Sequence, residues 1–258
     1  MRGLKEKLVV VTGGARGIGR AIAEKFAEEG SKIIIGDINY DQAKETKKEF
    51  EDAGHKCFAY KLDVSKVEEI EKFFSELKQK FGKIDVLVNN AGIQIRNPST
   101  DFLEKDWDLL MSINLKAVFF CSQQAARIMK DNGGGVIVNI SSGTSTQTTP
   151  GRAPYVISKA GVNALTAVLA SEWAKYGIRM NAVAPGWIMT EMVKDGMRLG
   201  VVSNKQLMAA IPFKRLADMS EIADSVVYLA SDNSSYVTGQ TLFVDGGWSS
   251  LGLPDIDL

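Results

Sequence analysis

Seven short runs rich in Val, Ile and other strand-forming residues recur along this 258-residue chain, with helical patterns between them. After the first run, Ile18, Ile22 and Phe26 recur at the spacing of one helix face. Strands joined by helices form a parallel sheet covered on both faces. Because no repeat, low-complexity tract or linker interrupts the pattern, the sequence predicts one α/β domain over residues 1–258, built on a doubly wound seven-stranded parallel sheet. The predicted strands are 7–12, 32–37, 57–63, 84–92, 135–142, 178–186 and 241–247, and the predicted helices are 18–30, 41–52, 66–82, 101–131 and 153–176.

Charge and composition exclude several classes of partner. Lys plus Arg number 31 and Asp plus Glu also number 31, so nothing indicates a nucleic acid or membrane partner. No stretch approaches the roughly 20 apolar residues of a membrane-spanning helix. The single histidine, His55, and the cysteines Cys57 and Cys121 match no recognised metal-ligand spacing. We therefore expect no metal site, two buried thiols and a cytoplasmic protein.

Glycines stand directly between the first predicted strand and the first predicted helix, in "VVVTGGARGIGRAI". Gly13, Gly17 and Gly19 permit a tight turn and a close approach of the backbone to a ligand. The N-terminus of the following helix offers N–H groups and a positive dipole to a pyrophosphate. The loop from Gly13 to Gly19, with Arg16 and Ile18, is therefore predicted to bind a dinucleotide cofactor.

An acidic residue at the end of the second strand indicates which dinucleotide binds. Asp37 stands 20 residues after Gly17, where a carboxylate can accept both ribose hydroxyls of NAD and would repel the 2′-phosphate of NADP. The simpler alternative is a turn aspartate. Arg16 would suit a phosphate, but Ile38 supplies no second positive charge. The sequence favours NAD, with NADP the less favoured cofactor.

A tyrosine and a lysine four residues apart, Tyr155 and Lys159, would share one face of a helix. A cation beside a phenol favours its ionised form, which suits acid/base chemistry. Spacing alone does not identify a site, because Tyr40 and Lys44 form a second such pair. Ser142, at the end of a predicted strand, precedes only the first pair by 13 residues, and the corresponding residue before Tyr40 is Ala27.

The motifs together resemble the short-chain dehydrogenase/reductase superfamily, from about Leu8 to Gly247. "TGGARGIG" is similar to its T-G-x-x-x-G-x-G loop, and "NNAG" (89–92) to its fourth-strand motif. "YVISK" (155–159) matches Y-x-x-x-K, and "PGWIMT" (185–190) matches P-G-x-x-x-T. The resemblance implies a Rossmann-type fold and hydride transfer between a nicotinamide cofactor and a CH–OH group.

The resemblance also implies roles for individual residues. Tyr155 would be the acid/base, Ser142 would hydrogen-bond the substrate oxygen, and Asn114 would hold a water that extends the proton path. Lys159 would bind the nicotinamide ribose and lower the pKa of Tyr155. Further cofactor contacts are implied for Asp63, Val64, Asn89, Ala91, Gly92, Pro185, Gly186, Ile188 and Thr190.

The substrate is indicated less directly. The sequence around Gln94 and Arg96, and segments such as "EWAKYGIRMNAVAPGW" and "VDGGW", look most like the sugar-acid and polyol dehydrogenases of the superfamily, such as gluconate and 2-deoxygluconate dehydrogenases. Arg96 and Arg152 are candidates to bind a carboxylate through the planar guanidinium fork, the alternative being solvated surface arginines. Gln94 and Trp187 are further candidates for the pocket wall.

Two other functions remain open. A 3-oxoacyl-acyl-carrier-protein reductase belongs to the same superfamily, but Asp37 disfavours NADPH and no obvious basic cluster awaits an acidic carrier protein. A non-catalytic NAD(P)-sensing protein on the same fold is the other alternative, since fold alone does not fix function. The presence of Asn114, Ser142, Tyr155 and Lys159 argues against it.

Assembly and mobile parts are predicted from apolar and irregular segments. The helical stretches 101–131 and 153–176 carry apolar residues on more than one side, which indicates a second packing partner. With the resemblance, this predicts a homotetramer. Residues 187–215 are expected to form a substrate lid, or alternatively a packing pair of helices, and residues 248–258 a tail that extends a subunit contact. The apolar residues that spread round the two helical stretches 101–131 and 153–176 are Leu109, Ile113, Val118, Phe119, Phe120, Val162, Leu165, Val168, Leu169 and Trp173.

Overall fold

A parallel sheet of seven strands forms the centre of the computed structural model, which describes residues 1–148, 150–190, 193, 197–198 and 203–251. Neighbouring strands follow the order β3-β2-β1-β4-β5-β6-β7, and every pair is parallel. The order reverses between β1 and β4, which is where doubly wound sheets bind their ligands. The strands are β1 (Leu8–Thr12), β2 (Lys32–Asp37), β3 (Cys57–Lys61), β4 (Val86–Asn89), β5 (Gly135–Ile140), β6 (Ile178–Pro185) and β7 (Thr241–Val244).

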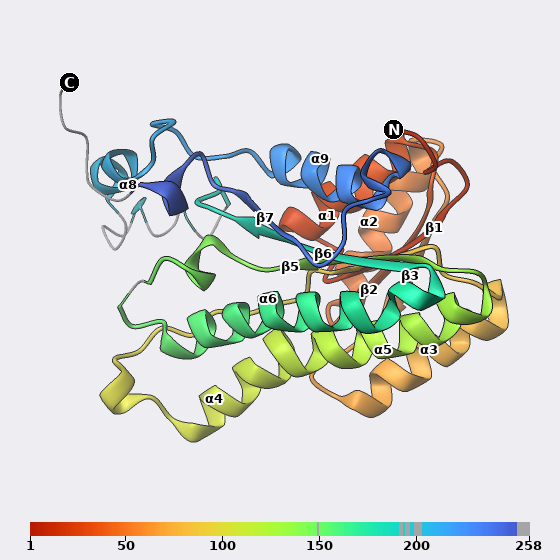
Figure 1. The fold of residues 1–258 in the computed structure, drawn as a ribbon, viewed down its shortest axis with the longest axis horizontal. Coiled ribbons are helices and arrows are strands. Elements are labelled where there is room, and N and C mark those ends of the chain that lie inside the picture. The colour runs from red at the N-terminus through yellow and green to blue at the C-terminus, as the bar shows by residue number, and fades with distance from the viewer. Residues whose placement is uncertain (149, 191–192, 194–196, 199–202, 252–258) are drawn as a thin grey trace.

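Helices cover both faces of this sheet (Figure 1). One layer contains α1 (Gly17–Glu28), α2 (Tyr40–Asp52) and α9 (Met219–Ala230). The opposite layer contains α3 (Val67–Phe81), α4 (Glu104–Met111), α5 (Ala117–Asp131) and α6 (Ala153–Trp173). The short helix α8 (Asn204–Ala210) lies beyond one end of the sheet (Figure 1). None of the described helices combines the length and apolar character needed to cross a bilayer.

Two hydrophobic cores lie between the sheet and its helix layers. Successive strand residues point to opposite faces, so Val9 and Val11 pack into the core that contains Phe26 of α1. Val10 points the other way, into the core that contains Phe74 of α3. Because both faces are buried, the strands read as continuous apolar runs instead of alternating ones, and this is why the sequence pattern identified them.

The structure differs from the predicted elements in three places. The predicted helix 101–131 begins at Glu104 and is interrupted by a π-helical turn over residues 112–116. The predicted strand 84–92 forms a strand only over Val86–Asn89, and the next two residues, Asn90 and Ala91, donate their backbone N–H groups to the Thr12 hydroxyl. Helix α9 was not predicted at all. Its N-terminus is capped where Glu221 accepts the backbone N–H of Asp218 at 2.9 Å, and it packs on α1.

The predicted lid and tail lie partly outside the described residues. Within 187–215, α8 is formed, and Leu207, Ile211 and Leu216 make a small separate core against which Trp187 packs. The tail begins with a short 3₁₀ turn over Trp248–Ser250, and residues 252–258 lie outside the described part.

Candidate active site

The loop between β1 and α1 has the conformation and the open space that a dinucleotide pyrophosphate needs. Gly13 and Gly17 have φ angles of 63° and 58°, which residues with a side chain rarely adopt. A Cβ on Gly17 would meet nothing within 4 Å, whereas a Cβ on Gly19 would lie 2.1 Å from the carbonyl oxygen of Gly13. Gly17 therefore leaves room for an anion at the N-terminus of α1, and Gly19 lets this helix pack against the loop.

Polar side chains from three other elements hold this loop. Asp37, at the end of β2, accepts the backbone N–H of Ala15 at 3.0 Å, and Thr46 of α2 donates to the Ala15 carbonyl at 2.8 Å. Asn90 donates to the carbonyl oxygen of Gly13 at 2.9 Å. Thr46 and Asn90 were not among the predicted site residues. Asn90 stands inside the "NNAG" motif, so the sequence did contain a signal for it.

The predicted selectivity residues lie beside the loop. The carboxyl of Asp37 is buried and also accepts the backbone N–H of Asn39 at 3.0 Å. Arg16 immediately precedes α1 and is exposed, and Ile38 is 64% exposed. One carboxylate and one guanidinium therefore lie beside the glycine loop, at the edge of the sheet where the strands have their carboxyl ends.

Several other predicted cofactor residues use their side chains elsewhere. The Asp63 carboxylate accepts the backbone N–H and the hydroxyl of Ser65, at 3.0 and 2.6 Å. Val64 belongs to the core, and the Asn89 amide makes two hydrogen bonds inside the protein. Ala91, which follows in the same motif, is half-buried. Val64 and Asn89 therefore offer a ligand only their main chains.

The segment after β6 continues along the same edge of the sheet. A Cβ on Gly186 would lie 2.6 Å from the Cα of Asp245, so the chain leaves Pro185 in contact with the end of β7. Ile188 is buried, and its carbonyl oxygen accepts the backbone N–H of Thr190 at 2.8 Å. These residues follow β6, whereas the glycine loop follows β1. Because all strands are parallel, both segments lie at the edge of the sheet formed by the carboxyl ends of its strands.

Tyr155 and Lys159 lie one turn apart near the start of α6. The Lys159 Nζ is 5.8 Å from the centre of the Tyr155 ring and donates to the carbonyl oxygen of Ile140 at 2.7 Å. A Cβ on Gly92 would lie 3.7 Å from this Nζ and 3.4 Å from Asn114 Oδ1. The loop after β4 therefore borders Tyr155 and Lys159. The end of β5 and the turn that carries Asn114 lie beside the same two residues.

Burial shifts the proton affinities of this pair. It raises the pKa of the Tyr155 phenol, while hydrogen bonding from Ser142 and the charge of Arg152 act in the opposite direction. Burial lowers the pKa of Lys159 to about 8. The sequence predicted that Lys159 lowers the Tyr155 pKa. In the structure the cation whose charge lowers this pKa is Arg152.

The Ser142 hydroxyl is oriented by its own loop. Ser142 follows β5 and is buried, and its Oγ accepts the backbone N–H of Thr144 at 3.2 Å and the Thr144 hydroxyl at 2.9 Å. With both acceptor positions of the oxygen occupied, the Ser142 proton is free to be donated to another oxygen. Thr144 was not predicted as a site residue.

Asn114 stands in the π-helical turn that separates α4 from α5. Its side chain is fully buried and is paired with the main chain of Ile93, accepting the N–H at 2.9 Å and donating to the carbonyl at 2.8 Å. The amide thus fastens the loop after β4 to the helix.

Arg152 interacts with two other predicted substrate residues, Trp187 and Arg96, and its charge acts on Tyr155. Arg152 is only 8% exposed, its Cζ lies 5.2 Å from the centre of a Trp187 ring, and its Nε has no hydrogen-bond partner among the described residues. Burial, and then the positive charge of Arg96, lower the Arg152 pKa. Gln94 is half-buried on the same loop as Arg96. A buried, incompletely paired guanidinium beside a second one is an arrangement that favours an anion.

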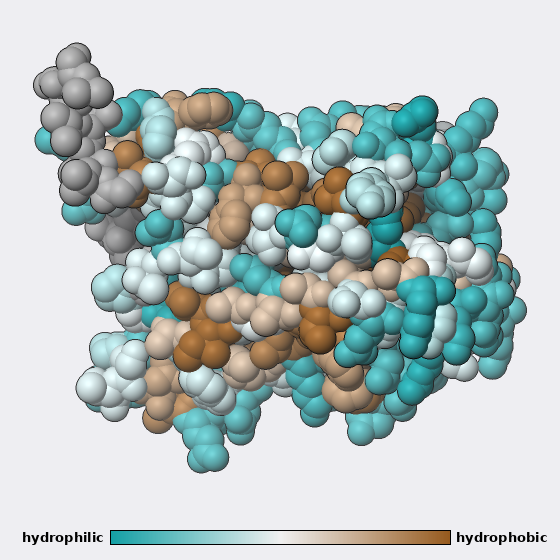
Figure 2. Space-filling view, viewed as in Figure 1, coloured by the Kyte–Doolittle hydropathy of each residue, from teal (hydrophilic) through white to brown (hydrophobic). Residues whose placement is uncertain are grey.

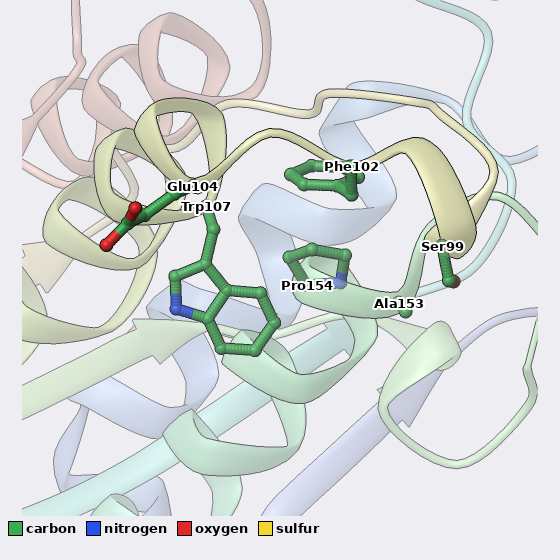
Figure 3. A pocket seen from close by; sticks show the side chains of 6 residues that line it. All are labelled: Ser99, Phe102, Glu104, Trp107, Ala153 and Pro154. Atoms are coloured by element: carbon green, nitrogen blue, oxygen red, sulfur yellow. The ribbon is translucent and has the colours of Figure 1, made fainter.

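A separate hollow of about 310 Å³ lies between α4 and the N-terminal end of α6 (Figure 3). The rings of Phe102, Trp107 and Pro154 face one another there, and the Glu104 carboxylate points away from them. None of the predicted catalytic residues is among its walls, which are completed by Ser99 and Ala153. It is therefore separate from the predicted catalytic residues.

The second Tyr–Lys pair has a simpler role. The Lys44 Nζ lies 4.9 Å from the centre of the Tyr40 ring and 2.8 Å from Asp41, and all three side chains are exposed on α2. The second pair is therefore an exposed pair on a helix surface.

Comparison with known proteins gives consistent matches over almost the whole chain. The model of a family described as enoyl-(acyl carrier protein) reductase matches residues 13–249. A 3-oxoacyl-acyl-carrier-protein reductase of Staphylococcus epidermidis is 40% identical over 245 residues, which cover 93% of this chain and 98% of that protein. An NAD-dependent glycerol dehydrogenase of Listeria innocua is 37% identical, with 95% of each chain covered. The structure of a gluconate 5-dehydrogenase from Burkholderia cenocepacia, in complex with NADP and tartrate, superposes with a TM-score of 0.90 at 37% identity and covers 97% of each chain.

Proposed function

The chain belongs to the short-chain dehydrogenase/reductase family, whose members are oxidoreductases acting on CH–OH groups, and we propose that it transfers a hydride between NAD(H) and a secondary alcohol or ketone of a small polar substrate. Polyols, sugars and sugar acids are the substrate classes, and we propose sugar acids first. The observation that carries this choice is the buried Arg152 guanidinium beside Tyr155, with an Nε that no described residue pairs.

The residues at the carboxyl edge divide the reaction between them. A nicotinamide bound here supplies the acceptor or donor of the hydride. In the oxidation direction the Tyr155 phenolate takes the proton of the substrate hydroxyl as the hydride leaves the same carbon. Ser142, whose Oγ already accepts two hydrogen bonds, donates its own proton to the substrate oxygen and holds it beside the phenol. In reduction, Tyr155 returns the proton.

Cofactor residues would bind and orient the dinucleotide. The glycine loop and the N-terminus of α1 would hold the pyrophosphate, and Lys159 would contact the nicotinamide ribose. Asp37 would accept the hydroxyls of the adenosine ribose, which supports NAD over NADP. One similar protein is named for NAD and another was solved with NADP, so the proposed preference rests on Asp37.

The carboxylate of a sugar acid fits the arginine pair. Arg152 and Arg96 repel each other, and burial of Arg152 adds a desolvation cost. A substrate carboxylate would offset both, because a guanidinium can give it two parallel hydrogen bonds. The Trp187 ring under Arg152 would keep the guanidinium plane in place. A substrate bound in this way places its hydroxyl-bearing carbons toward Tyr155.

Comparison of acidic and neutral substrates tests this proposal. We expect Arg152→Met to lower kcat/KM for gluconate by ~10²-fold or more, the size of a lost charged hydrogen-bonded pair. Turnover of sorbitol and glycerol should change little when it is measured at a pH alkaline enough for Tyr155 to be ionised in both proteins. Arg2→Met, far from the site, serves as the control for loss of an arginine. Equal losses on acids and neutral polyols would show that Arg152 supports the site without binding a carboxylate.

A second candidate function is supported by the 40% identity to 3-oxoacyl-acyl-carrier-protein reductases. The same Tyr155 and Ser142 would then protonate and bind the 3-oxo group of an acyl thioester. Turnover of acetoacetyl-CoA with NADPH, measured beside gluconate oxidation with NAD, separates the two candidates. A higher kcat/KM for the thioester would favour the reductase.

Assembly into a homotetramer is proposed from the outer face of the second helix layer. Leu109 of α4 is 45% exposed, and Ile157 and Val168 of α6 are 46% and 52% exposed. Figure 2 shows apolar surface gathered over α4 and α6. An apolar surface of this kind on two adjacent helices supports a contact with another subunit.

A further inference from the structure

Three residues of α6 stand four apart and project from one face of the helix: Tyr155, Lys159 and Asn163. The first two have proposed roles in the reaction. Asn163 is half-buried and points at the loop that follows β5. The face that carries the acid/base therefore also carries an amide directed at the segment that contains Ser142.

Asn163 contacts this loop on both sides of Ser142. The Ser141 hydroxyl donates to Asn163 Oδ1 at 2.6 Å, and Asn163 Nδ2 donates to the Ser145 hydroxyl at 2.9 Å. Ser145 in turn donates its backbone N–H to the Ser142 carbonyl at 2.9 Å. One side chain of α6 thus spans the residue immediately before Ser142 and the residue three positions after it. The Ser141 hydroxyl also lies 3.2 Å from the carbonyl oxygen of Lys159, so Asn163 makes the shorter of two bonds from Ser141 to α6.

The bonds that orient the Ser142 hydroxyl do not by themselves place it relative to α6. Both come from Thr144, two residues along the same loop, so they move with the loop. Tyr155 is fixed to the helix. Ser142 and Tyr155 can contact the same substrate oxygen only if the loop is bonded to the helix close to Ser142. Reacting groups tolerate little displacement.

We infer that Asn163 is a positioning residue that sets the separation between the Ser142 hydroxyl and the Tyr155 phenol. The inference rests on the proposed roles of Ser142 and Tyr155 in hydride transfer. Asn163 acts only through the loop and touches neither the glycine loop nor Asp37 in the described contacts. Its loss should therefore slow the chemical step and leave NAD binding unchanged.

A double-mutant cycle with Ser142 tests the inference. Asn163→Leu keeps the size of the side chain and removes both bonds, and we expect kcat to fall by ~10- to 10²-fold, the effect of a displaced reacting group. The dissociation constant for NAD, from a fluorescence titration, should stay within about twofold, because the glycine loop and the N-terminus of α1 are not altered. In a Ser142→Ala background the same Asn163→Leu change should cost less than about twofold, because no serine is left to position.

Two further variants complete the design. Asn163→Asp keeps acceptors for the hydroxyls of Ser141 and Ser145 and should restore most of the turnover. Asn132→Leu removes an asparagine with two side-chain bonds at the opposite edge of the sheet and should leave kcat unchanged. If Asn163→Leu does not fold, Ser145→Ala removes the bond between Asn163 and Ser145 from the loop side. This variant then replaces Asn163→Leu in the double-mutant cycle with Ser142→Ala.

The outcomes separate this inference from the proposed function. If Ser142→Ala is slow and Asn163→Leu costs the same factor with and without Ser142, the positioning role is wrong and Asn163 is merely structural. If Ser142→Ala retains full turnover, the proposed role of Ser142 is wrong, and the positioning role is overturned with it. Slow single variants with a non-additive double variant support both.

Discussion

The ammonium of Lys159 donates a 2.7 Å hydrogen bond to the backbone carbonyl of Ile140, the last residue of β5. Lys159 is 4% exposed, and burial lowers its pKa to about 8 from an ordinary value of 10.5. One neutral carbonyl cannot replace the water that the ammonium has lost. At neutral pH the folded protein therefore holds a charge at this site at the expense of stability.

Lys159→Met is expected to raise the stability of the protein at pH 7. The shift from 10.5 to about 8 corresponds to about 3 kcal/mol at 1.36 kcal/mol for each pKa unit, against which the lost Ile140 bond counts about 1 kcal/mol. The gain in the free energy of unfolding is fully present below pH 8, where Lys159 is charged in both the folded and the unfolded protein. Between pH 8 and 10.5 the folded lysine is neutral while the unfolded one is still charged, so the cost of burying Lys159, and with it the gain from the substitution, decreases as the pH rises.

Urea unfolding of both proteins at pH 7 and pH 10 measures this difference. The free energy of unfolding should differ by more at pH 7 than at pH 10, and the variant should have lost most of its activity. If Lys159→Met is less stable than the unmutated protein, and by the same amount at pH 7 and at pH 10, a pKa lowered by burial is contradicted.

The Tyr155 pKa predicts the pH dependence of turnover. Oxidation needs the phenolate, so its rate should rise with pH, and because burial raises this pKa the rise should lie on the alkaline side. Arg152 lowers the same pKa, so Arg152→Met should move the rise to higher pH. Rates are measured with a neutral polyol, whose binding does not depend on the arginine.

Tyr155→Phe removes the titrating hydroxyl and nothing else. We expect kcat to fall by ~10²–10⁴-fold, the usual contribution of general acid/base catalysis, and the alkaline rise to disappear. NAD binding should be nearly unchanged. Tyr40→Phe, in the exposed pair on α2, is the matched control. Retention of most of the wild-type kcat would show that another group moves the proton.

The fold was largely predictable because its signals are local. Strands buried on both faces, such as β1 and β2, appear as unbroken apolar runs, and the glycines after β1 mark the turn into α1. Helix α9 was missed although Asp218 and Glu221 stand three apart, as in a capping box. The irregular sequence before it obscured the start of its apolar pattern.

The site was predictable only as far as motifs reach. Spacing placed Tyr155, Lys159 and Ser142 together, but it contains no information on side-chain direction. That the Asn114 amide pairs with Ile93, and that Arg152 is buried against an aromatic ring, depends on contacts between segments far apart in the chain. Such contacts follow from the packed fold, not from local pattern.

Cofactor choice is predicted from Asp37. A carboxylate facing a 2′-phosphate costs several kcal/mol, so kcat/KM for NAD should exceed that for NADP by on the order of 10²-fold. Asp37→Ala should narrow this ratio. Because Asp37 also holds the backbone of Ala15, affinity for both cofactors should fall, and the ratio is the informative quantity. Asp41→Ala, an exposed neighbour, is the control. Equal kcat/KM values in the unmutated enzyme would indicate that Arg16 dominates.

The outer face of α4 and α6 predicts the state of assembly. Trp107 and Leu109 on α4 and Ile157 and Val168 on α6 are each between 38% and 52% exposed in the single chain. Figure 2 shows apolar surface over these two helices. Leaving this much apolar area in water is unfavourable by about 25 cal/mol for each Å², so a subunit contact over both helices would stabilise the protein.

Light scattering behind a sizing column measures this assembly. At micromolar concentration we expect a mass of two or four chains of 28.1 kDa, with four the proposed state. Val168→Glu places a charge in the middle of the α6 face and should lower the mass, whereas Tyr40→Ser on α2, in the opposite helix layer, should not. Loss of assembly in Val168→Glu with an unchanged circular dichroism spectrum would assign the contact to α6. A mass near one chain for the unmutated protein would rule the assembly out and leave these apolar residues as ordinary surface.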